Sequence, residues 1–318
     1  MHSSKLLAVS CAAALSAYGA IAQAADVVIG VPNWPSVRAT AHVLKVALES
    51  KLGIEVELQD GENRTVFEAM DAGTIHVHPE LWLPNMSNFK GLYVDAKQTI
   101  RMNPNAVSGE QAMCVTKASA ERTGIVALKD LTDADMASQF DNDGDGKGDV
   151  WIGASGWAST TVEKIRARSY GYDDTMTLLE MDESDALARL DSAVENDRNI
   201  VLFCYTPHHM FAQHELVRLE EPAYDAKRWL IVQPSATPGW LERSTAGVAW
   251  DAASIHVAYA ASLEVDQPDA AAMLANVALD AETLTGMTYA LVVEQKDPAE
   301  FAAQWVEENA DTVDGWLP

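Results

Sequence analysis

The sequence predicts an α/β protein with two lobes, each a mostly parallel sheet flanked by helices, and a ligand cleft between the lobes. Two observations carry this prediction. The chain has 318 residues, enough for two lobes with separate cores. Strand-like and helix-like segments alternate from Val27 onward, and a second alternation restarts at Gln111. Such alternation is typical of parallel sheets with helices on their faces.

The first 24 residues are expected to be a secretory signal peptide. Lys5 supplies a positive start, an apolar stretch follows, and Ala22 and Ala24 form an A-x-A cleavage site. The apolar stretch is shorter than the roughly 20 residues of a membrane-spanning helix. We therefore expect a periplasmic protein that is not itself inserted into the membrane.

The chain is strongly acidic, with 22 basic and 47 acidic side chains and a formal net charge of −25. Such a surface repels nucleic acid and anionic lipid, which argues against both as partners. Cys114 and Cys204 both lie in apolar, strand-like segments. An oxidising compartment permits a disulfide between them, but two buried free thiols fit the pattern equally well.

The N-terminal alternation predicts the elements of lobe 1. A helix capped by Ser36 has apolar residues at helical spacing and ends at Gly53, and a shorter helix ends at Gly73. Three strands are expected around these helices, over 27–31, 54–58 and 74–78. Lobe 1 is assigned residues 25–107 and 234–318, the latter segment dominated by helical patterns.

Lobe 2 is assigned residues 108–233, and it contains an acidic loop at 141–149. Its expected elements alternate in the same way. They are a strand from Gln111, strands over 150–154, 175–180 and 199–204, and helices over 159–170 and 184–196.

The loop DNDGDGKGD matches the first nine positions of an EF-hand-type loop. The candidate ligands of a Ca²⁺ ion are four carboxylates and one backbone carbonyl, namely Asp141, Asp143, Asp145, Lys147 and Asp149. The twelfth position is Ile152 instead of the bidentate glutamate, so the motif is truncated. The alternatives are a structural Ca²⁺ ion and a solvated acidic turn. No organic cofactor is expected.

Tryptophans occur where strands pass into loops. Trp34, Trp82 and Trp157 each lie beside a predicted strand end or helix start, the usual rim for ligands in α/β folds. Several indole faces around one point attract a methylated ammonium group by cation–π interaction. This chemistry requires no catalytic residue, so we do not expect an enzyme.

A transition-metal site is the rival interpretation. His76, His78 and Glu80 share one face if their segment is extended, and further histidines follow at His208 and later positions. This pattern would make the protein a secreted metal-binding or metal-dependent protein. A nucleophilic triad is not indicated by the sequence.

The whole mature chain resembles the substrate-binding proteins of quaternary-amine ABC transporters, the glycine betaine-binding class. The resemblance rests on FDNDGDGKGDV followed by GASGW, on LWLPN, on CYTPHH and on the terminal VDGWL. It implies a type II-like periplasmic binding fold, a monomer, a methylated amine as ligand and a membrane permease as partner.

The resemblance also implies the residues of an aromatic box. Trp82, Trp157 and Tyr205 occupy the positions that match the family's box. Met86 stands where the family has a histidine that holds the carboxylate of betaine. This departure argues against betaine.

Trp34 and Trp151, with VHPELWLPN and CYTPHHMF, are similar to the trimethylamine N-oxide-binding proteins of marine bacteria. That ligand needs aromatic rings and one hydrogen-bond donor. A protonated carboxyl group of Glu80 or Glu110 could serve, and it would repel the carboxylate of betaine. The resemblance therefore implies trimethylamine N-oxide as ligand, with glycine betaine, choline or a sulfonium osmolyte as the alternatives.

Overall fold

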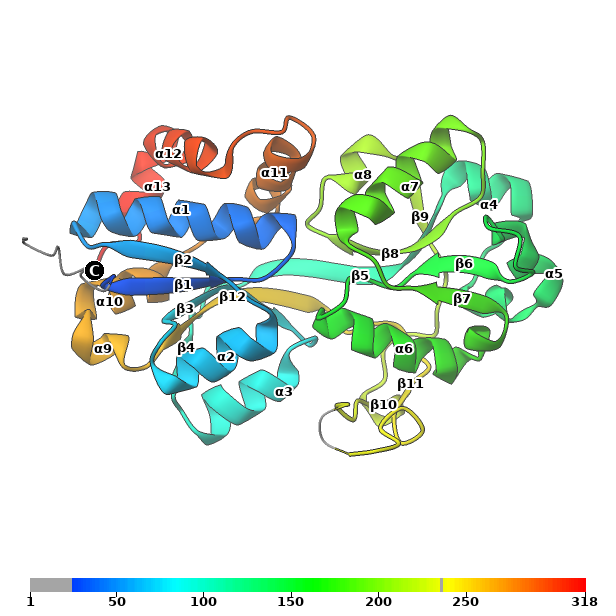
Figure 1. Ribbon diagram of the computed structural model, residues 1–318, viewed down its shortest axis with the longest axis horizontal. Helices are drawn as coiled ribbons and strands as arrows, with labels where there is room; N and C mark the ends of the chain where they lie inside the picture. Colours follow the sequence, from blue (N-terminus) through cyan, green and yellow to red (C-terminus); the bar gives the residue numbers. More distant parts are fainter. Residues whose placement is uncertain (1–24, 235–236) are drawn as a thin grey trace, which may run out of the picture.

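The computed structural model describes residues 25–234 and 237–318, and it shows two α/β lobes side by side (Figure 1). The expected signal peptide therefore lies outside the described residues. Residues 25–109 and 253–318 form lobe 1, and residues 110–234 and 237–252 form lobe 2. None of the helices in the described part of the chain has the length and apolar character that a membrane span requires.

Lobe 1 contains a sheet with the strand order β2-β1-β3-β12, and β4 also pairs with β12. The strands are β1 (Val27–Val31), β2 (Val56–Asp60), β3 (Val77–Leu83), β4 (Ile100–Met102) and β12 (Ala253–Ala260). β1 is parallel to β2 and β3, whereas β12 is antiparallel to β3. The sheet is therefore mixed, and the strand β12 lies in a region for which the sequence indicated mainly helices.

Helices cover both faces of this sheet. The long helix α1 packs with α11 and α12 on one face, while α2 and α3 lie on the other (Figure 1). The helices of lobe 1 are α1 (Pro35–Leu52), α2 (Asn63–Ala72), α3 (Ser87–Phe89), the π-helix η1 (Lys90–Ala96), α9 (Leu263–Asp266), α10 (Pro268–Asn276), α11 (Ala281–Val292), α12 (Pro298–Glu308) and α13 (Ala310–Asp314).

The expected C-terminal ends of α1 and α2 are confirmed, whereas the expected cap at Ser36 is wrong, because α1 begins at Pro35 and the hydroxyl of Ser36 donates to Glu80. Pro35 occupies the first turn of α1, where a missing N–H costs no hydrogen bond. Gly53 and Gly73 follow the two helices in the left-handed conformation that terminates a helix and favours glycine.

Lobe 2 contains the strand order β5-β8-β6-β7, with β9 also paired to β5. The strands are β5 (Val107–Thr116), β6 (Gly148–Trp151), β7 (Met176–Leu179), β8 (Val201–Thr206) and β9 (Leu216–Arg218). A separate hairpin-like pair is formed by β10 (Trp229–Leu230) and β11 (Thr245–Ala246). Again the sheet is mixed, because β5 is antiparallel to β8 while β6 is parallel to β7 and β8.

The helices of lobe 2 also lie on two faces, with α7 and α8 opposite α6 (Figure 1). They are α4 (Lys117–Thr123), α5 (Ala134–Ala137), α6 (Ala158–Tyr170), α7 (Glu183–Glu195) and α8 (Met210–Gln213). Short 3₁₀ turns are η2 (Leu128–Thr132), η3 (Ser138–Phe140), η4 (Tyr172–Asp174) and η5 (Ala226–Arg228).

The chain crosses between the lobes at two places. The long strand β5 makes the first crossing, since Val107–Gly109 pair with β12 and Glu110–Val115 pair with β8. The return lies between Trp250 and Ala253, later than the expected boundary at 233/234. The reason is a buried ion network on α6, in which Arg166 contacts Glu163 at 3.0 Å and binds the carbonyl of Val248. This network holds the returning segment on lobe 2.

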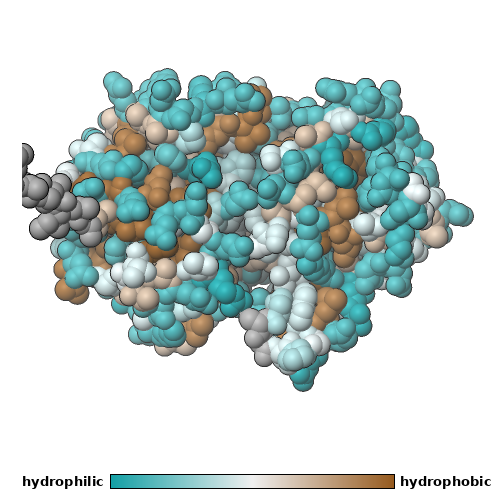
Figure 2. Space-filling model, viewed as in Figure 1, coloured by the Kyte–Doolittle hydropathy of each residue, from teal (hydrophilic) through white to brown (hydrophobic). Residues whose placement is uncertain are grey.

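Cys114 and Cys204 form a disulfide, which resolves the two alternatives left by the sequence. The bond joins the neighbouring strands β5 and β8, whose antiparallel register brings the two residues diagonally opposite each other. Outside the core, the visible face is covered mainly by hydrophilic residues (Figure 2), as expected from the high net charge.

Candidate functional site

A small cavity of about 40 Å³ lies between the two lobes. Lobe 1 lines the cavity with residues at the starts of α1 and α2 and at the end of β3. Lobe 2 lines it with residues of β5, β8 and the start of α6. The lining residues are Trp34, Asn63, Trp82, Asn85, Met86, Gln111, Trp157, Ala158, Ser159, Phe203 and Tyr205. The cavity is thus the place where the predicted aromatic side chains meet.

Four of the predicted aromatic residues form the walls of this cavity. The ring centroids of Trp82 and Tyr205 are 5.5 Å apart at 89°. Those of Trp157 and Tyr205 are 6.1 Å apart at 81°, and those of Trp34 and Trp157 are 6.3 Å apart at 82°. Because neighbouring rings are nearly perpendicular, they enclose a point from several sides instead of stacking. We call these four residues the aromatic box.

Trp151 lies outside the box, so the structure does not place it in the lining of the cavity where the sequence predicted it. Its ring packs edge-on against Trp157 at 5.8 Å, and its indole N–H donates to the carbonyl of Met181 at 3.0 Å. Trp151 therefore supports the wall from behind. Phe203 lines the cavity in its place, two residues before Tyr205 on the same face of β8. The alternation of strand side chains could have indicated it.

Glu80 is buried beneath the box, where it accepts hydrogen bonds from four side chains. The indole N–H groups of Trp34 and Trp82 donate to Oε2 at 2.8 and 3.2 Å. The hydroxyl of Ser36 donates to the same oxygen at 2.7 Å, and that of Thr40 donates to Oε1 at 2.9 Å. Burial raises the pKa of Glu80, while these four hydrogen bonds oppose the rise.

Glu80 therefore holds the rings of the box, and it does not line the cavity. Both oxygens already accept hydrogen bonds from neighbouring side chains. Glu110, the other candidate donor, is also misplaced. It is an exposed residue of β5 that pairs with Arg218 at 2.6 Å. The structure thus places neither of the two predicted donors in the lining of the cavity.

The polar lining of the cavity consists of amides and one hydroxyl. Asn85 of lobe 1 and Gln111 of lobe 2 exchange two hydrogen bonds, at 2.6 and 2.9 Å. Ser159 lies in the first turn of α6, which has no side-chain cap. The first amides of a helix carry partial positive charge and can donate hydrogen bonds to an oxygen atom of a ligand. No arginine, lysine or histidine is among the described residues that line the cavity.

Asn33 links the two lobes by two hydrogen bonds. Its carbonyl accepts a hydrogen bond from the indole N–H of Trp157 at 2.9 Å, and its side chain donates to Asp182 at 3.3 Å. Asn33 belongs to lobe 1, whereas both partners belong to lobe 2. The structure is therefore a closed arrangement in which box residues themselves bridge the lobes.

Residues 25–308 match the family described as the substrate binding domain of the ABC-type glycine betaine transport system. The chain belongs to this family. The family description is that of a transporter's binding component, not of an enzyme. Glycine betaine, which the family description names, carries a methylated ammonium group of the kind that aromatic rings attract.

Curated relatives are distant. The glycine betaine-binding periplasmic protein OusX of Dickeya dadantii is 31% identical over 42% of this chain and 38% of its own length. The chain thus matches well under half of that relative. The glycine betaine/proline betaine-binding periplasmic protein of Escherichia coli is 22% identical over 74% of this chain and 72% of its own length.

Solved structures confirm the two-lobed fold. A ProX protein from Borrelia burgdorferi superposes with a TM-score of 0.72 at 21% identity, covering 92% of this chain and 96% of that one. A choline-binding protein in complex with choline gives 0.72 at 18% identity, covering 91% and 90%. Lactococcal OpuAC with glycine betaine gives 0.70 at 18%, covering 92% and 99%. At these identities the likeness supports the fold alone.

Within this family fold, sequence reasoning missed the support of Tyr205. The hydroxyl of Tyr205 donates to Oε1 of Glu183 at 2.6 Å, and Nε2 of His208 lies 3.0 Å from the same oxygen. Glu183 begins α7, a helix far from Tyr205 in the sequence. The sequence of CYTPHH indicated a family resemblance and a candidate metal ligand at His208, but nothing in it indicated a carboxylate partner for Tyr205.

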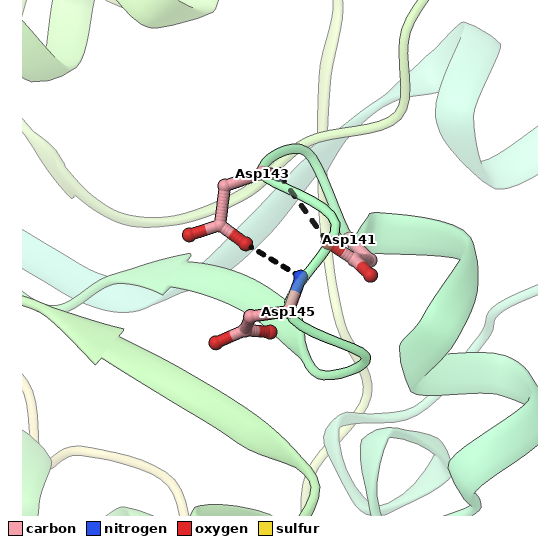
Figure 3. A group of neighbouring side chains, drawn as sticks. All are labelled: Asp141, Asp143 and Asp145. Carbon is pink, nitrogen blue, oxygen red and sulfur yellow. Dashed lines mark hydrogen bonds between the residues drawn. The ribbon is translucent and has the colours of Figure 1, made fainter.

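The acidic loop brings together three of its five expected ligands. Carboxylate oxygens of Asp141, Asp143 and Asp145 lie within 4.8 Å of one another (Figure 3). Backbone amides of Gly144 and Gly146 donate to Asp141 and lower its pKa. The structure does not place the Asp149 carboxylate in this group.

Asp149 is buried, and neither carboxylate oxygen has a hydrogen-bond partner. Burial and the nearby Asp143 raise its pKa. An unsatisfied buried carboxylate is costly unless a cation or water molecules accompany it. The donor set of the loop, oxygen atoms only, fits a hard cation. The predicted ligand set is therefore formed only at Asp141, Asp143 and Asp145 among the described residues.

The histidine-based metal site is not formed by the described residues. Nδ1 of His76 accepts a hydrogen bond from the amide of Val28 at 2.9 Å. Nε2 of His78 lies 2.9 Å from Oδ1 of Asn63, and its Nδ1 accepts from the amide of Glu80 at 3.2 Å. Both rings therefore make hydrogen bonds within lobe 1, near the start of β3. The three loop aspartates are the only metal-ligand cluster in the described part of the chain.

Proposed function

We propose that this protein is the substrate-binding component of an ABC importer and that it captures trimethylamine N-oxide in the aromatic box. The bound form would deliver the ligand from the periplasm to a membrane permease. The observation that carries the proposal is the set of four nearly perpendicular rings around a cavity of about 40 Å³. Such rings attract a compact methylated nitrogen by cation–π interaction.

The oxygen of the ligand needs a donor, and the cavity offers two kinds. The uncapped first turn of α6, at Ala158 and Ser159, presents backbone amides, and the amide groups of Asn85 and Gln111 line the same cavity. These donors replace the protonated glutamate that the sequence suggested. An N-oxide has one oxygen, so one or two neutral donors satisfy it.

The lining disfavours a ligand with a carboxylate. Glycine betaine would bring a full negative charge into a cavity without a basic side chain, above the buried carboxylate of Glu80. Met86 lines the cavity at the position where the resemblance implies a carboxylate-binding histidine. A buried charge without a partner is penalised strongly. The N-oxide avoids this penalty.

A second candidate remains in the same box. The family description and the names of relatives concern glycine betaine, and the backbone amides at the N-terminus of α6 can donate hydrogen bonds to a carboxylate. Choline shares the trimethylammonium group, and sulfonium osmolytes carry a methylated sulfonium group in its place. Betaine and choline differ from trimethylamine N-oxide only at the end away from the rings.

Calorimetric titration of purified protein with trimethylamine N-oxide, glycine betaine and choline tests the proposal. The N-oxide has about five heavy atoms, and about −1.5 kcal/mol per atom gives a ceiling of about −7.5 kcal/mol, a low-micromolar Kd. We expect binding of the N-oxide in this range and weaker binding of betaine. Tighter binding of betaine would assign the protein to the betaine-binding class instead.

A Ca²⁺ ion in the acidic loop is the second part of this proposal. Asp141, Asp143 and Asp145 would hold the ion, with the buried Asp149 reached through a water molecule, as is common at the ninth position. The loop leads directly into β6, which ends at Trp151 behind the box. Binding of the ion would stiffen this wall.

Thermal unfolding before and after chelation tests the ion. We expect Tm to fall when calcium is removed and to return when it is restored, and Asp143→Asn should abolish the difference. An unchanged Tm in both states would show that the loop is a solvated turn.

A further inference from the structure

The polar edges of three box rings are directed at buried carboxylates. The indole N–H groups of Trp34 and Trp82 donate to Glu80, and the phenol of Tyr205 donates to Glu183. Glu80 and Glu183 are only 1% and 5% exposed. The box thus presents its π faces to the ligand while anionic groups stand behind it on both lobes.

No lysine or arginine of the described residues pairs with Glu183. Among the described residues, its ion-pair contact is with His208, whose Nε2 lies 3.0 Å from Oε1. Nδ1 of His208 accepts a hydrogen bond from the amide of Met210 at 3.0 Å, which places the proton of the neutral ring on Nε2. Oε2 of Glu183 is buried without a hydrogen-bond partner.

The neighbouring histidine adds no positive charge at neutral pH. The ring of His209 stacks on His208 with centroids 4.3 Å apart. Burial, followed by the proximity of His208 and His214, lowers the pKa of His209 to about 3. Among the described residues, the hydrogen bond that the Glu183 carboxylate accepts is the one from the hydroxyl of Tyr205.

The charge acts on the ligand through Tyr205. A phenol that donates a hydrogen bond to a carboxylate becomes richer in electrons, which strengthens its attraction for a cation. Burial and the carboxylates of Glu183 and Glu80 raise the pKa of Tyr205 well above its usual value, so both acids act on this ring. In a dry site their fields are weakly screened.

We infer that Glu183 is a specificity-determining residue, which polarises the box so that it selects a methylated onium group over an uncharged group of the same shape. This inference rests on the proposed function of the box. It adds that the selection comes partly from a residue that does not touch the ligand. The class of ligand selected has a cationic head and no carboxylate.

The test compares choline with its carba analogue, in which a carbon atom replaces the nitrogen. The two probes have nearly the same shape and differ by one positive charge. Calorimetry on the full mature chain measures both affinities in the wild type, in Glu183→Gln and in Glu110→Gln. The last variant removes the same charge from an exposed residue outside the box, and it controls for net charge.

In Glu183→Gln we expect the affinity for choline to fall on the order of tenfold, while that for the carba analogue stays within about twofold. Glu110→Gln should leave both affinities unchanged. An equal loss for the two probes would overturn the inference, because it would show that Glu183 merely holds Tyr205 in place. An unchanged ratio with unchanged affinities would overturn it as well.

Tyr205→Phe provides a second route if Glu183→Gln does not fold. It keeps the ring but removes the hydrogen bond, so the preference for choline over the carba analogue should again decrease. A preserved preference would contradict the inference. A wild-type protein that binds no onium compound would overturn the proposed function and this inference with it, whereas a wild type that binds isolates the role of Glu183.

Discussion

Replacement of Glu80 tests how far the box depends on one buried carboxylate. In Glu80→Ala the indole N–H groups of Trp34 and Trp82 lose their acceptor in a buried environment, at about 1–3 kcal/mol each. The hydroxyls of Ser36 and Thr40, the other two donors, can rotate toward other acceptors, which limits their loss. Two orphaned donors thus cost about 2–6 kcal/mol.

Part of this cost is offset, because burial raises the pKa of Glu80 and the variant no longer buries a charge. We therefore expect a net loss of about 2–4 kcal/mol in the free energy of unfolding. Affinity for the onium ligand should fall at least tenfold, because the two indole rings lose their fixed orientation.

Urea unfolding followed by circular dichroism measures the stability of Glu80→Ala, and calorimetry measures its affinity. Glu110→Ala is the matched control. Its side chain is exposed and paired only on the surface, so the change should stay within about 0.5 kcal/mol. If Glu80→Ala matched the wild type in stability and in affinity, the assignment of Glu80 as the anchor of the box would be refuted.

Three further predictions concern the surroundings of the box. Burial lowers the pKa of His78 to about 3, so its contribution to stability is complete above about pH 6.5 and decreases by about 1.4 kcal/mol per pH unit below it. Urea unfolding of His78→Gln should lose this part of the slope and keep the part due to His209, whose pKa is also lowered to about 3. Reduction of the bond between Cys114 and Cys204, separated by 90 positions, should lower stability by about 2–5 kcal/mol in the same assay. In Gly153→Ala the new Cβ would lie 2.4 Å from Oγ1 of Thr160 at a φ of +116°, so Tm should fall and ligand affinity with it.

The regular elements of the fold were predictable because local signals agree with the tertiary structure. The helix α1 follows from its apolar spacing, from Pro35 and from Gly53, and each of these acts within a few residues. Strand β12 was not predicted. Its segment lies between helical patterns, and it becomes a strand because β3, β4 and β5 offer it hydrogen-bonding edges from distant parts of the chain.

The candidate site was predictable as a set of rings but not as an arrangement. Trp34, Trp82, Trp157 and Tyr205 each follow a strand end or lie near one, and the fold brings such positions to the cleft. Whether a ring forms the wall or supports it depends on its hydrogen bonds. The indole N–H of Trp151 donates to the carbonyl of Met181, a hydrogen bond that no local sequence pattern predicts.

The absence of a local sequence signal also explains why the roles of Glu80 and Glu183 were not predicted. Sequence reasoning assigned Glu80 to the ligand because it sits beside Trp82, but the structure surrounds its carboxylate with donors from α1 and β3. Glu183 lies on another helix, and only the packing of α7 against β8 reveals its bond to Tyr205. Acids that act through a ring leave no spacing that identifies them.

The box is also the contact by which the lobes recognise each other. Trp157 bonds to the carbonyl of Asn33, and Trp82 packs edge-on against Tyr205 from the opposite lobe, so the walls exist as a set only when the lobes meet. Closure without a ligand would leave the π faces around an unoccupied cation site, above two buried carboxylates. A ligand with positive charge supplies the missing attraction and shifts the population toward the closed form. Selection of the ligand and closure of the lobes are therefore one equilibrium, in which an uncharged ligand of the same shape stabilises closure less.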